Sequence, residues 1–150
     1  MCIRDRKYAL DTNVLARSIE SDHPQNAEAI AAILALLQRA HDVYVLPQNL
    51  IEFWVISTRP RKENGLGLSP VEADAHLAKF ESLFLLPADH KAVYDTWRRL
   101  VTEHEVRGKN AHDARIAAAL MVHKITHLVT FNTSDFKRFT EITVLAPSNV

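Results

Sequence analysis

Short apolar runs alternate with longer stretches of helical periodicity along most of the chain, and this alternation limits the folds open to it. The runs predicted as strands are Tyr8–Leu10, Val43–Leu46, Phe84–Leu86, Leu128–Phe131 and Ile142–Leu145. Strands separated by helices pair in parallel through right-handed crossovers. We therefore expect an α/β fold with three layers, α/β/α, in which helices flank a central, mostly parallel sheet of about five strands.

Helices are predicted over residues 13–20, 27–39, 48–57, 70–82, 89–103 and 111–123. The second of these has Ile30, Leu34 and Leu37 on one face at helical spacing. The fourth has the clearest start, because Ser69 can cap it, Pro70 suits the first helical position and Glu72 completes a capping box. The glycine-containing segment 62–67 before it is predicted to be a loop.

Four acidic residues fall where such a sheet would bring them together. Asp11 follows the first strand and Asp135 follows the strand at 128–131. Glu52 and Asp113 lie early in helices that begin on the same edge, beyond the carboxyl ends of the strands, where ligands bind in parallel sheets. Two carboxylates ~4 Å apart at an effective dielectric of about 20 repel by on the order of 4 kcal/mol. Their convergence predicts a hard divalent cation bound by oxygen ligands.

Each of these acids, taken alone, also has an ordinary structural explanation. Asp11 could cap the next helix, and Asp113 gains from the helix dipole in a first turn. Asp135 could be a turn residue before Phe136. Glu52 is harder to explain in this way, because its helix is apolar on nearly every face and a buried carboxylate is costly unless it is paired or bound to metal. In this order and on this edge, the four together indicate a metal site.

Polar and basic residues near the acids are candidates for supporting roles. The polar group, which could orient carboxylates or a metal-bound water, is Thr12, Asn13, Thr130 and Asn132. The basic group, which could contact phosphate groups of a ligand, is Arg59, Arg61, Lys62, Lys109 and Arg115. Arg115 could hold either a phosphate or a neighbouring carboxylate. Ordinary solvated loop charge explains the loop cations equally well.

The composition excludes several other classes of protein. Lys+Arg and Asp+Glu both number 18, so the chain does not wrap nucleic acid by bulk charge. Cys2 is the only cysteine, which excludes an internal disulfide and fits a reducing cytoplasm. No glycine-rich phosphate loop, signal peptide or bilayer-length apolar stretch is visible, so no membrane association is expected. We expect one domain over residues 7–147, with residues 1–6 as a charged leader outside the fold.

Four short segments contain the four acids: Leu10–Leu15, Pro47–Trp54, Ala111–Ala118 and Thr130–Phe136. In this order, they together resemble the PIN-domain ribonucleases of the VapC toxin type. The resemblance implies a Mg²⁺ or Mn²⁺ site and RNA cleavage, with the family's acidic residues on Asp11, Glu52, Asp113 and Asp135. Asn132 falls at a position that is polar in relatives. Bacterial and archaeal members are commonly toxins neutralised by a cognate antitoxin, so an antitoxin groove and a homodimer face are expected.

The mechanism expected from this resemblance is metal-dependent hydrolysis of the RNA backbone. Asp11, Asp113 and Asp135 would hold one or two cations, and Glu52 would orient or deprotonate the attacking water. The products would carry a 5′-phosphate and a 3′-hydroxyl.

Two alternatives stay open on sequence grounds. A haloacid-dehalogenase-like phosphohydrolase also has an aspartate after its first strand, but it needs a second one two residues later, where this chain has Asn13. A non-catalytic PIN-like module would retain the acids and hold RNA without cutting it.

Overall fold

The computed structural model describes residues 6–39 and 41–150, and its centre is a parallel four-stranded sheet in the order β2-β1-β3-β4. The strands are β1 (Lys7–Leu10), β2 (Asp42–Tyr44), β3 (His127–Val129) and β4 (Thr143–Leu145). All three neighbouring pairs are parallel, so the predicted α/β class is confirmed. The predicted leader lies outside the described residues, except for Arg6, which is exposed.

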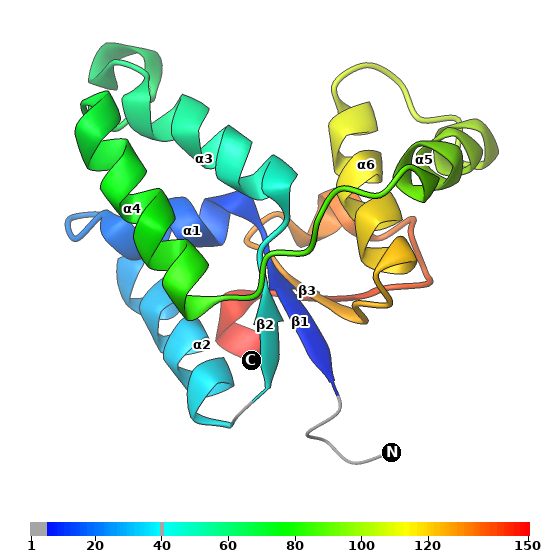
Figure 1. The fold of residues 1–150 in the computed structure, drawn as a ribbon, viewed down its shortest axis with the longest axis horizontal. Coiled ribbons are helices and arrows are strands. Elements are labelled where there is room, and N and C mark those ends of the chain that lie inside the picture. The colour runs from blue at the N-terminus through cyan, green and yellow to red at the C-terminus, as the bar shows by residue number, and fades with distance from the viewer. Residues whose placement is uncertain (1–5, 40) are drawn as a thin grey trace.

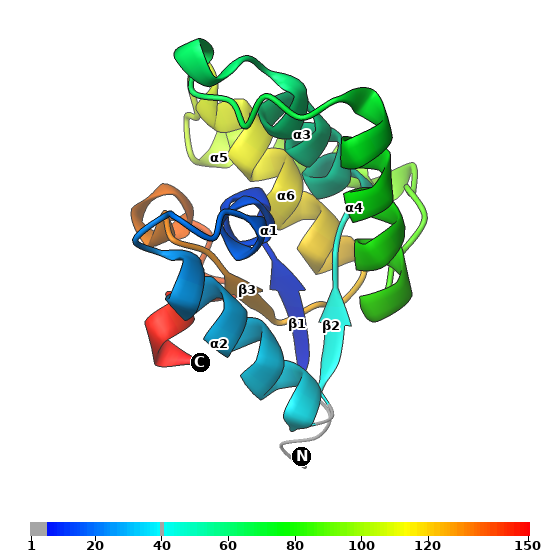
Figure 2. The same ribbon diagram turned by 90° about the vertical axis from the view of Figure 1, so that its left-hand side faces the viewer.

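Helices cover both faces of this sheet. They are α1 (Thr12–Ile19), α2 (Asn26–Gln38), α3 (Pro47–Thr58), α4 (Pro70–Leu83), α5 (Ala92–Glu103) and α6 (Asn110–Val122), with short 3-10 turns η2 (Arg61–Glu63), η3 (Thr133–Phe136) and η4 (Pro147–Asn149). In Figure 1, α1 to α4 lie to one side of the strands and α5 and α6 to the other. Figure 2 views the molecule from the side of α2 and α4. None of the helices in the described ranges is long and apolar enough to cross a bilayer.

The predicted strand at 84–86 is reduced to a single parallel bridge between Leu85 and Tyr44. Leu85 donates its N–H to the Val43 carbonyl (2.8 Å) and accepts from the N–H of Val45 (2.9 Å). The next donor along a parallel ladder would be residue 87, which is proline and has no N–H. The sheet therefore has four strands where about five were expected.

Three further boundaries differ from expectation by two residues or more. Strand β2 ends at Tyr44 and not at Leu46. Helix α5 begins at Ala92 and not at residue 89. The residues before it are not helical, and the ring Nδ1 of His90 accepts the N–H of Ala92 (3.0 Å). Strand β3 ends at Val129, which leaves Thr130 outside the strand. The start of α4 is confirmed, since Ser69 and Glu72 form the predicted capping box.

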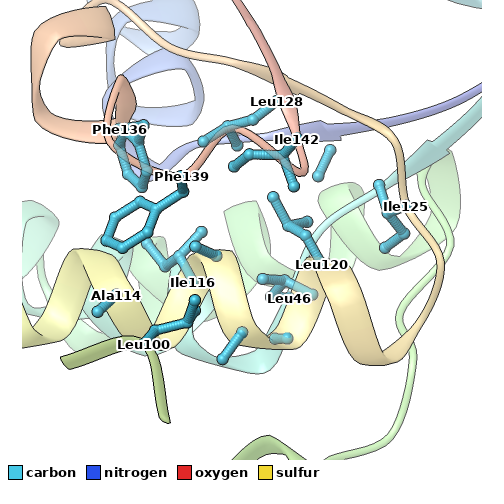
Figure 3. Packing of buried hydrophobic residues seen from close by; sticks show 14 of the residues in the cluster. Leu46, Leu100, Ala114, Ile116, Leu120, Ile125, Leu128, Phe136, Phe139 and Ile142 are labelled. Atoms are coloured by element: carbon cyan, nitrogen blue, oxygen red, sulfur yellow. The ribbon is translucent and has the colours of Figure 1, made fainter. Parts of the chain in front are cut away.

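Alternating strand residues contribute to two separate cores. Tyr8, Leu10 and Val129 pack toward α1, α2, α3 and α4, while Ala9 and Leu128 pack toward α5 and α6. Figure 3 shows the second core, in which Phe136 and Phe139 lie close to Leu128 and to the residues of α6. The central strands β1 and β3 are buried on both faces, as expected of a parallel sheet between helix layers.

Candidate functional site

Asp11 lies at the point where β1 ends and α1 begins, and its side chain is held from three directions. It is the N-cap residue of α1, with its Oδ1 accepting the N–H of Thr12 (2.8 Å). The Thr130 hydroxyl donates to Oδ2 (2.7 Å), and the Asn49 amide approaches Oδ1 at 3.5 Å. Only 7% of Asp11 is exposed. Asp11 can therefore cap α1 with one carboxylate oxygen and still belong to the acidic site.

The register of the sheet brings Thr130 to Asp11. Leu10 pairs with Val129, so the residues that follow these two strands emerge side by side. The Thr130 hydroxyl also accepts hydrogen bonds from the Asn13 amide (3.1 Å) and the N–H of Asn132 (3.0 Å). Thr130 thus connects the chain after β3 to the chain after β1. Asn132 itself is exposed and joins this network through its main chain.

Glu52, in the second turn of α3, is fixed at both carboxylate oxygens. The Thr12 hydroxyl donates to Oε2 (2.9 Å), and the Gln48 amide donates to Oε1 (2.9 Å). Thr12 also accepts from Asn49 (3.2 Å), which is fully buried. Glu52 and Asp11 are therefore linked through the neutral side chains of Thr12 and Asn49.

Asp113 and Asp135 complete the acidic group from two other elements. Asp113 lies half-buried in the first turn of α6, and Asp135 is exposed in η3. Partial burial raises the pKa of Asp113 from 3.8 to about 6, and the charges of Asp135, Asp11 and Glu52 add to this, in that order. Asp113 therefore lies close enough to the other three acids for their charges to raise its pKa.

Burial also raises the pKa of Asp11 from 3.8 to about 6. The hydrogen bonds from Thr130 and Thr12 oppose this rise, and the charges of Glu52 and Asp135 reinforce it. None of the ion pairs within residues 6–39 and 41–150 involves any of the four acids. Among the described residues, no lysine or arginine is therefore paired with these acids to offset their mutual repulsion.

The chemistry of these donors fits a hard divalent cation, because all are carboxylate oxygens. The spacing is wider than a finished metal centre: in the described part of the chain, no three acidic, histidine or cysteine side chains converge closely enough to hold an ion. The residues that fit such a cation by type and position are Asp11, Asp113 and Asp135.

The basic residues predicted to contact RNA fall at different distances from the acids. Lys109 immediately precedes α6 and is exposed at the Asp113 end of that helix. Arg61 and Lys62 are exposed in η2, beyond the far end of α3, while Arg59 donates to the main-chain carbonyl of Asn64 (3.1 Å) within the same loop. Arg115 lines the same pocket as Glu52 and contacts Gln48 (2.9 Å) and Asp89 (3.5 Å).

Three residues at this site were not predicted from the sequence: Gln48, Asn49 and Asp89. Gln48 and Asn49 had a detectable signal, because they precede Glu52 by four and three residues and so share its helix face. Both are also buried polar groups, which a protein retains only with hydrogen-bond partners. Asp89 had no such signal, since it lies outside any helix or strand and meets Arg115 only in the tertiary structure.

Comparison with known proteins places the chain among related folds. Residues 8–142 match the profile of the family described as PIN domain. VapBC2 from Rickettsia felis, solved bound to a DNA fragment from its promoter, is similar with a TM-score of 0.67 and 22% identity, over 93% of this chain and 97% of that one. FitAcB from Neisseria gonorrhoeae has a TM-score of 0.64 and 24% identity, over 95% and 99%. A toxin–antitoxin complex from Klebsiella pneumoniae has a TM-score of 0.64 and 20% identity, over 95% and 99%. At these identities the structures establish the shared fold. Comparison with curated protein sequences gave no significant match.

Proposed function

The chain belongs to the PIN-domain family, and from this premise we propose that it is a metal-dependent endoribonuclease. PIN domains are generally nucleases. The observation that carries the proposal is the crowding of Asp11, Glu52, Asp113 and Asp135 at one edge of the sheet without a compensating cation among the described residues. Repulsion of this kind is relieved by a divalent cation, for which carboxylates are suitable ligands.

Asp11, Asp113 and Asp135 are the proposed ligands of Mg²⁺ or Mn²⁺. A bound cation would polarise the phosphoryl oxygen of the substrate and stabilise the charge that develops on the leaving 3′-oxygen. Asp11 is oriented for this role by the hydrogen bonds from Thr130 and Thr12. Asp113 makes no side-chain hydrogen bond within the described residues, so its carboxylate is free to turn toward a ligand.

Glu52 is the proposed general base. Each of its oxygens accepts one hydrogen bond, from Thr12 and from Gln48, and keeps a lone pair for the attacking water. A proton from water passes to Glu52 as the water oxygen bonds to phosphorus. The bond from phosphorus to the 3′-oxygen then breaks, which leaves a 5′-phosphate and, after protonation, a 3′-hydroxyl.

The test is hydrolysis of labelled single-stranded RNA with Mg²⁺ or Mn²⁺ and mapping of the product ends. Asp113→Asn should reduce cleavage at least about 100-fold without unfolding the protein, because the carboxylate has no side-chain hydrogen bond to lose. Asp74→Asn, an exposed isosteric change on α4, is the matched control and should cleave as the wild type does. Undiminished cleavage in excess EDTA contradicts the metal-dependent mechanism.

One alternative has an observation in its favour. No three acids are already within ligating range in the described part of the chain, as expected of a PIN-like module that holds RNA without cutting it. RNA binding without cleavage at any Mg²⁺ or Mn²⁺ concentration would support that function. The phosphohydrolase alternative has less support, since the position that should carry its second aspartate is Asn13, whose amide is bonded to Thr130 and to the N–H of Phe131.

We further propose that the protein is the toxin of a toxin–antitoxin pair. Its similar folds include VapBC2 and the Klebsiella pneumoniae toxin–antitoxin complex. An apolar groove of about 340 Å³ between α1, α2 and α4 would receive an antitoxin segment; Leu34 and Leu83 on its walls are 49% and 44% exposed. Leu34→Glu should abolish co-purification with the product of a short upstream reading frame, and unaffected co-purification counts against this groove.

A second apolar face on α3 is proposed as the contact between two copies of the chain. Ile51 and Val55 are 65% and 51% exposed there, beside a cavity of about 480 Å³ that Trp54 and Leu86 also line. Light scattering should show a dimer for the wild type and a monomer for Val55→Glu. A monomeric wild type excludes this contact.

A further inference from the structure

Gln48 is a buried polar side chain whose hydrogen-bonding groups are used on three sides. Only 8% of the residue is exposed. Its amide nitrogen donates to Oε1 of Glu52 (2.9 Å) and to the main-chain carbonyl of His112 (2.9 Å). Its amide oxygen accepts from Nη1 of Arg115 (2.9 Å). The amide therefore connects α3, which carries Glu52, to the first turns of α6, which carry Asp113 and Arg115.

Arg115 and the two acceptor oxygens together determine which way this amide faces. A guanidinium group only donates hydrogen bonds, whereas a carboxylate and a main-chain carbonyl only accept them. With its oxygen toward Arg115, the amide satisfies all three neighbours. In the reversed orientation, the NH₂ group would face the guanidinium, and the amide oxygen would face two acceptor oxygens. The reversed state would be repulsive on every side.

We propose that Gln48 and Arg115 are positioning residues that hold the Glu52 carboxylate in the orientation needed to accept a proton. Arg115 acts through Gln48, and Gln48 acts on Glu52. The Thr12 hydroxyl holds the other oxygen of Glu52, so the carboxylate is fixed at both ends only while the amide faces the correct way. This inference rests on the proposed endoribonuclease function and adds two residues to its machinery.

The same contacts separate this role from phosphate binding. The side chain of Arg115 is 40% exposed, but its two terminal nitrogens are directed at the Gln48 amide and at the oppositely charged Asp89 carboxylate. An arginine that bound RNA phosphate would contribute to substrate affinity and to its dependence on salt. An arginine that positions Glu52 would contribute to the rate of the bound complex, because a misplaced catalytic group slows the chemical step.

Steady-state kinetics of RNA cleavage distinguish these roles. Arg115→Met should lower kcat by about tenfold to a hundredfold and leave KM within about twofold of the wild type. Arg115→Lys should recover most of the lost kcat, because an ammonium group also only donates hydrogen bonds. Arg99→Met removes an arginine from a comparable exposed ion pair on α5 and should leave both constants unchanged. A raised KM with unchanged kcat in Arg115→Met overturns the proposal, and so does a kcat within twofold of the wild type.

A second measurement does not depend on nuclease activity. In the ¹⁵N-correlated spectrum, the side-chain NH₂ signals of Gln48, assigned by their loss in Gln48→Leu, should exchange slowly with solvent because both protons are hydrogen-bonded. Arg115→Met should speed this exchange at least about tenfold, and Arg99→Met should not. Unchanged exchange in Arg115→Met overturns the inference even if RNA is cleaved. If the wild type cleaves no RNA although the exchange results are as expected, the proposed function fails while the contact between Arg115 and Gln48 stands.

Discussion

Replacing Asp11 with asparagine separates the electrostatic cost of the acidic site from its contribution to the fold. Burial raises the pKa of Asp11 from 3.8 to about 6. Because one pKa unit corresponds to about 1.36 kcal/mol, this rise means that folding disfavours the ionised form of Asp11 over the protonated form by about 3 kcal/mol. Asp11 is 7% exposed, so solvent screening reduces this figure little. The metal-free protein is therefore substantially less stable toward unfolding whenever Asp11 is ionised.

The sign of the pH dependence follows from the direction of the shift. Between pH 4 and pH 6 the folded chain retains a proton on Asp11 that the unfolded chain has largely lost. The unfolded state binds fewer protons in this window, so the contribution of Asp11 to the free energy of unfolding falls as the pH rises. The contribution is most favourable near pH 4 and is lost above pH 6.

The substitution also removes one hydrogen bond at every pH. The Thr130 hydroxyl already accepts from the Asn13 amide and from the N–H of Asn132, so it cannot accept from the NH₂ group of an asparagine at position 11 as well. Losing this bond costs about 1 kcal/mol. The Asp11→Asn protein should thus be about 1 kcal/mol less stable than the wild type at pH 4, and about 1 to 2 kcal/mol more stable at pH 7.5.

Urea unfolding in EDTA at constant ionic strength, repeated from pH 4 to pH 7.5, measures both the cost of ionising Asp11 and the loss of the hydrogen bond. The stability curves of the two proteins should cross, and Asp74→Asn should follow the wild type as the exposed control. Adding Mg²⁺ at pH 7.5 should stabilise the wild type and have little effect on Asp11→Asn. Parallel curves for wild type and Asp11→Asn would refute the assignment of a raised pKa to Asp11.

Four further substitutions test other parts of the structure. Glu52→Gln should reduce kcat for RNA cleavage at least about 100-fold with little change in KM, because the amide cannot accept the proton; a rate within tenfold of the wild type excludes Glu52 as the base. Gly65→Ala should destabilise the fold by roughly 2 kcal/mol or more in urea unfolding, since a Cβ there would lie 1.9 Å from the main-chain oxygen of Arg59. Gly108→Ala, which meets no atom within 4 Å but has φ +60°, should cost only about 1 kcal/mol, and equal effects would contradict the steric argument. Phe136→Ala should cost about 3 to 5 kcal/mol in the same assay, because this residue of η3 is 1% exposed in the core, and a cost below about 1 kcal/mol would contradict that packing.

Much of the fold was determined by local properties of the sequence. The alternation of apolar runs and helical segments was sufficient to predict a parallel α/β sheet, because helical crossovers leave little choice of strand direction. The start of α4 followed from Ser69 and Glu72 alone. The four acids could be selected because each lies directly after a strand or early in a helix, positions whose location in a parallel sheet is fixed by topology.

The tertiary structure decided what depends on contacts between distant residues. The strand expected at 84–86 appears only as a bridge, because the tertiary structure pairs Leu85 with Tyr44 and so puts Pro87, which has no N–H, at the next donor position of the ladder. The raised pKa values of Asp11 and Asp113 depend on burial by other elements. Arg115 was expected to hold a phosphate or a neighbouring carboxylate, and the structure pairs it with the Asp89 carboxylate and with the Gln48 amide, 26 and 67 positions away in the chain. A residue's type limits the hydrogen bonds it can form, but its partners are set by packing, and packing is not encoded in any single segment.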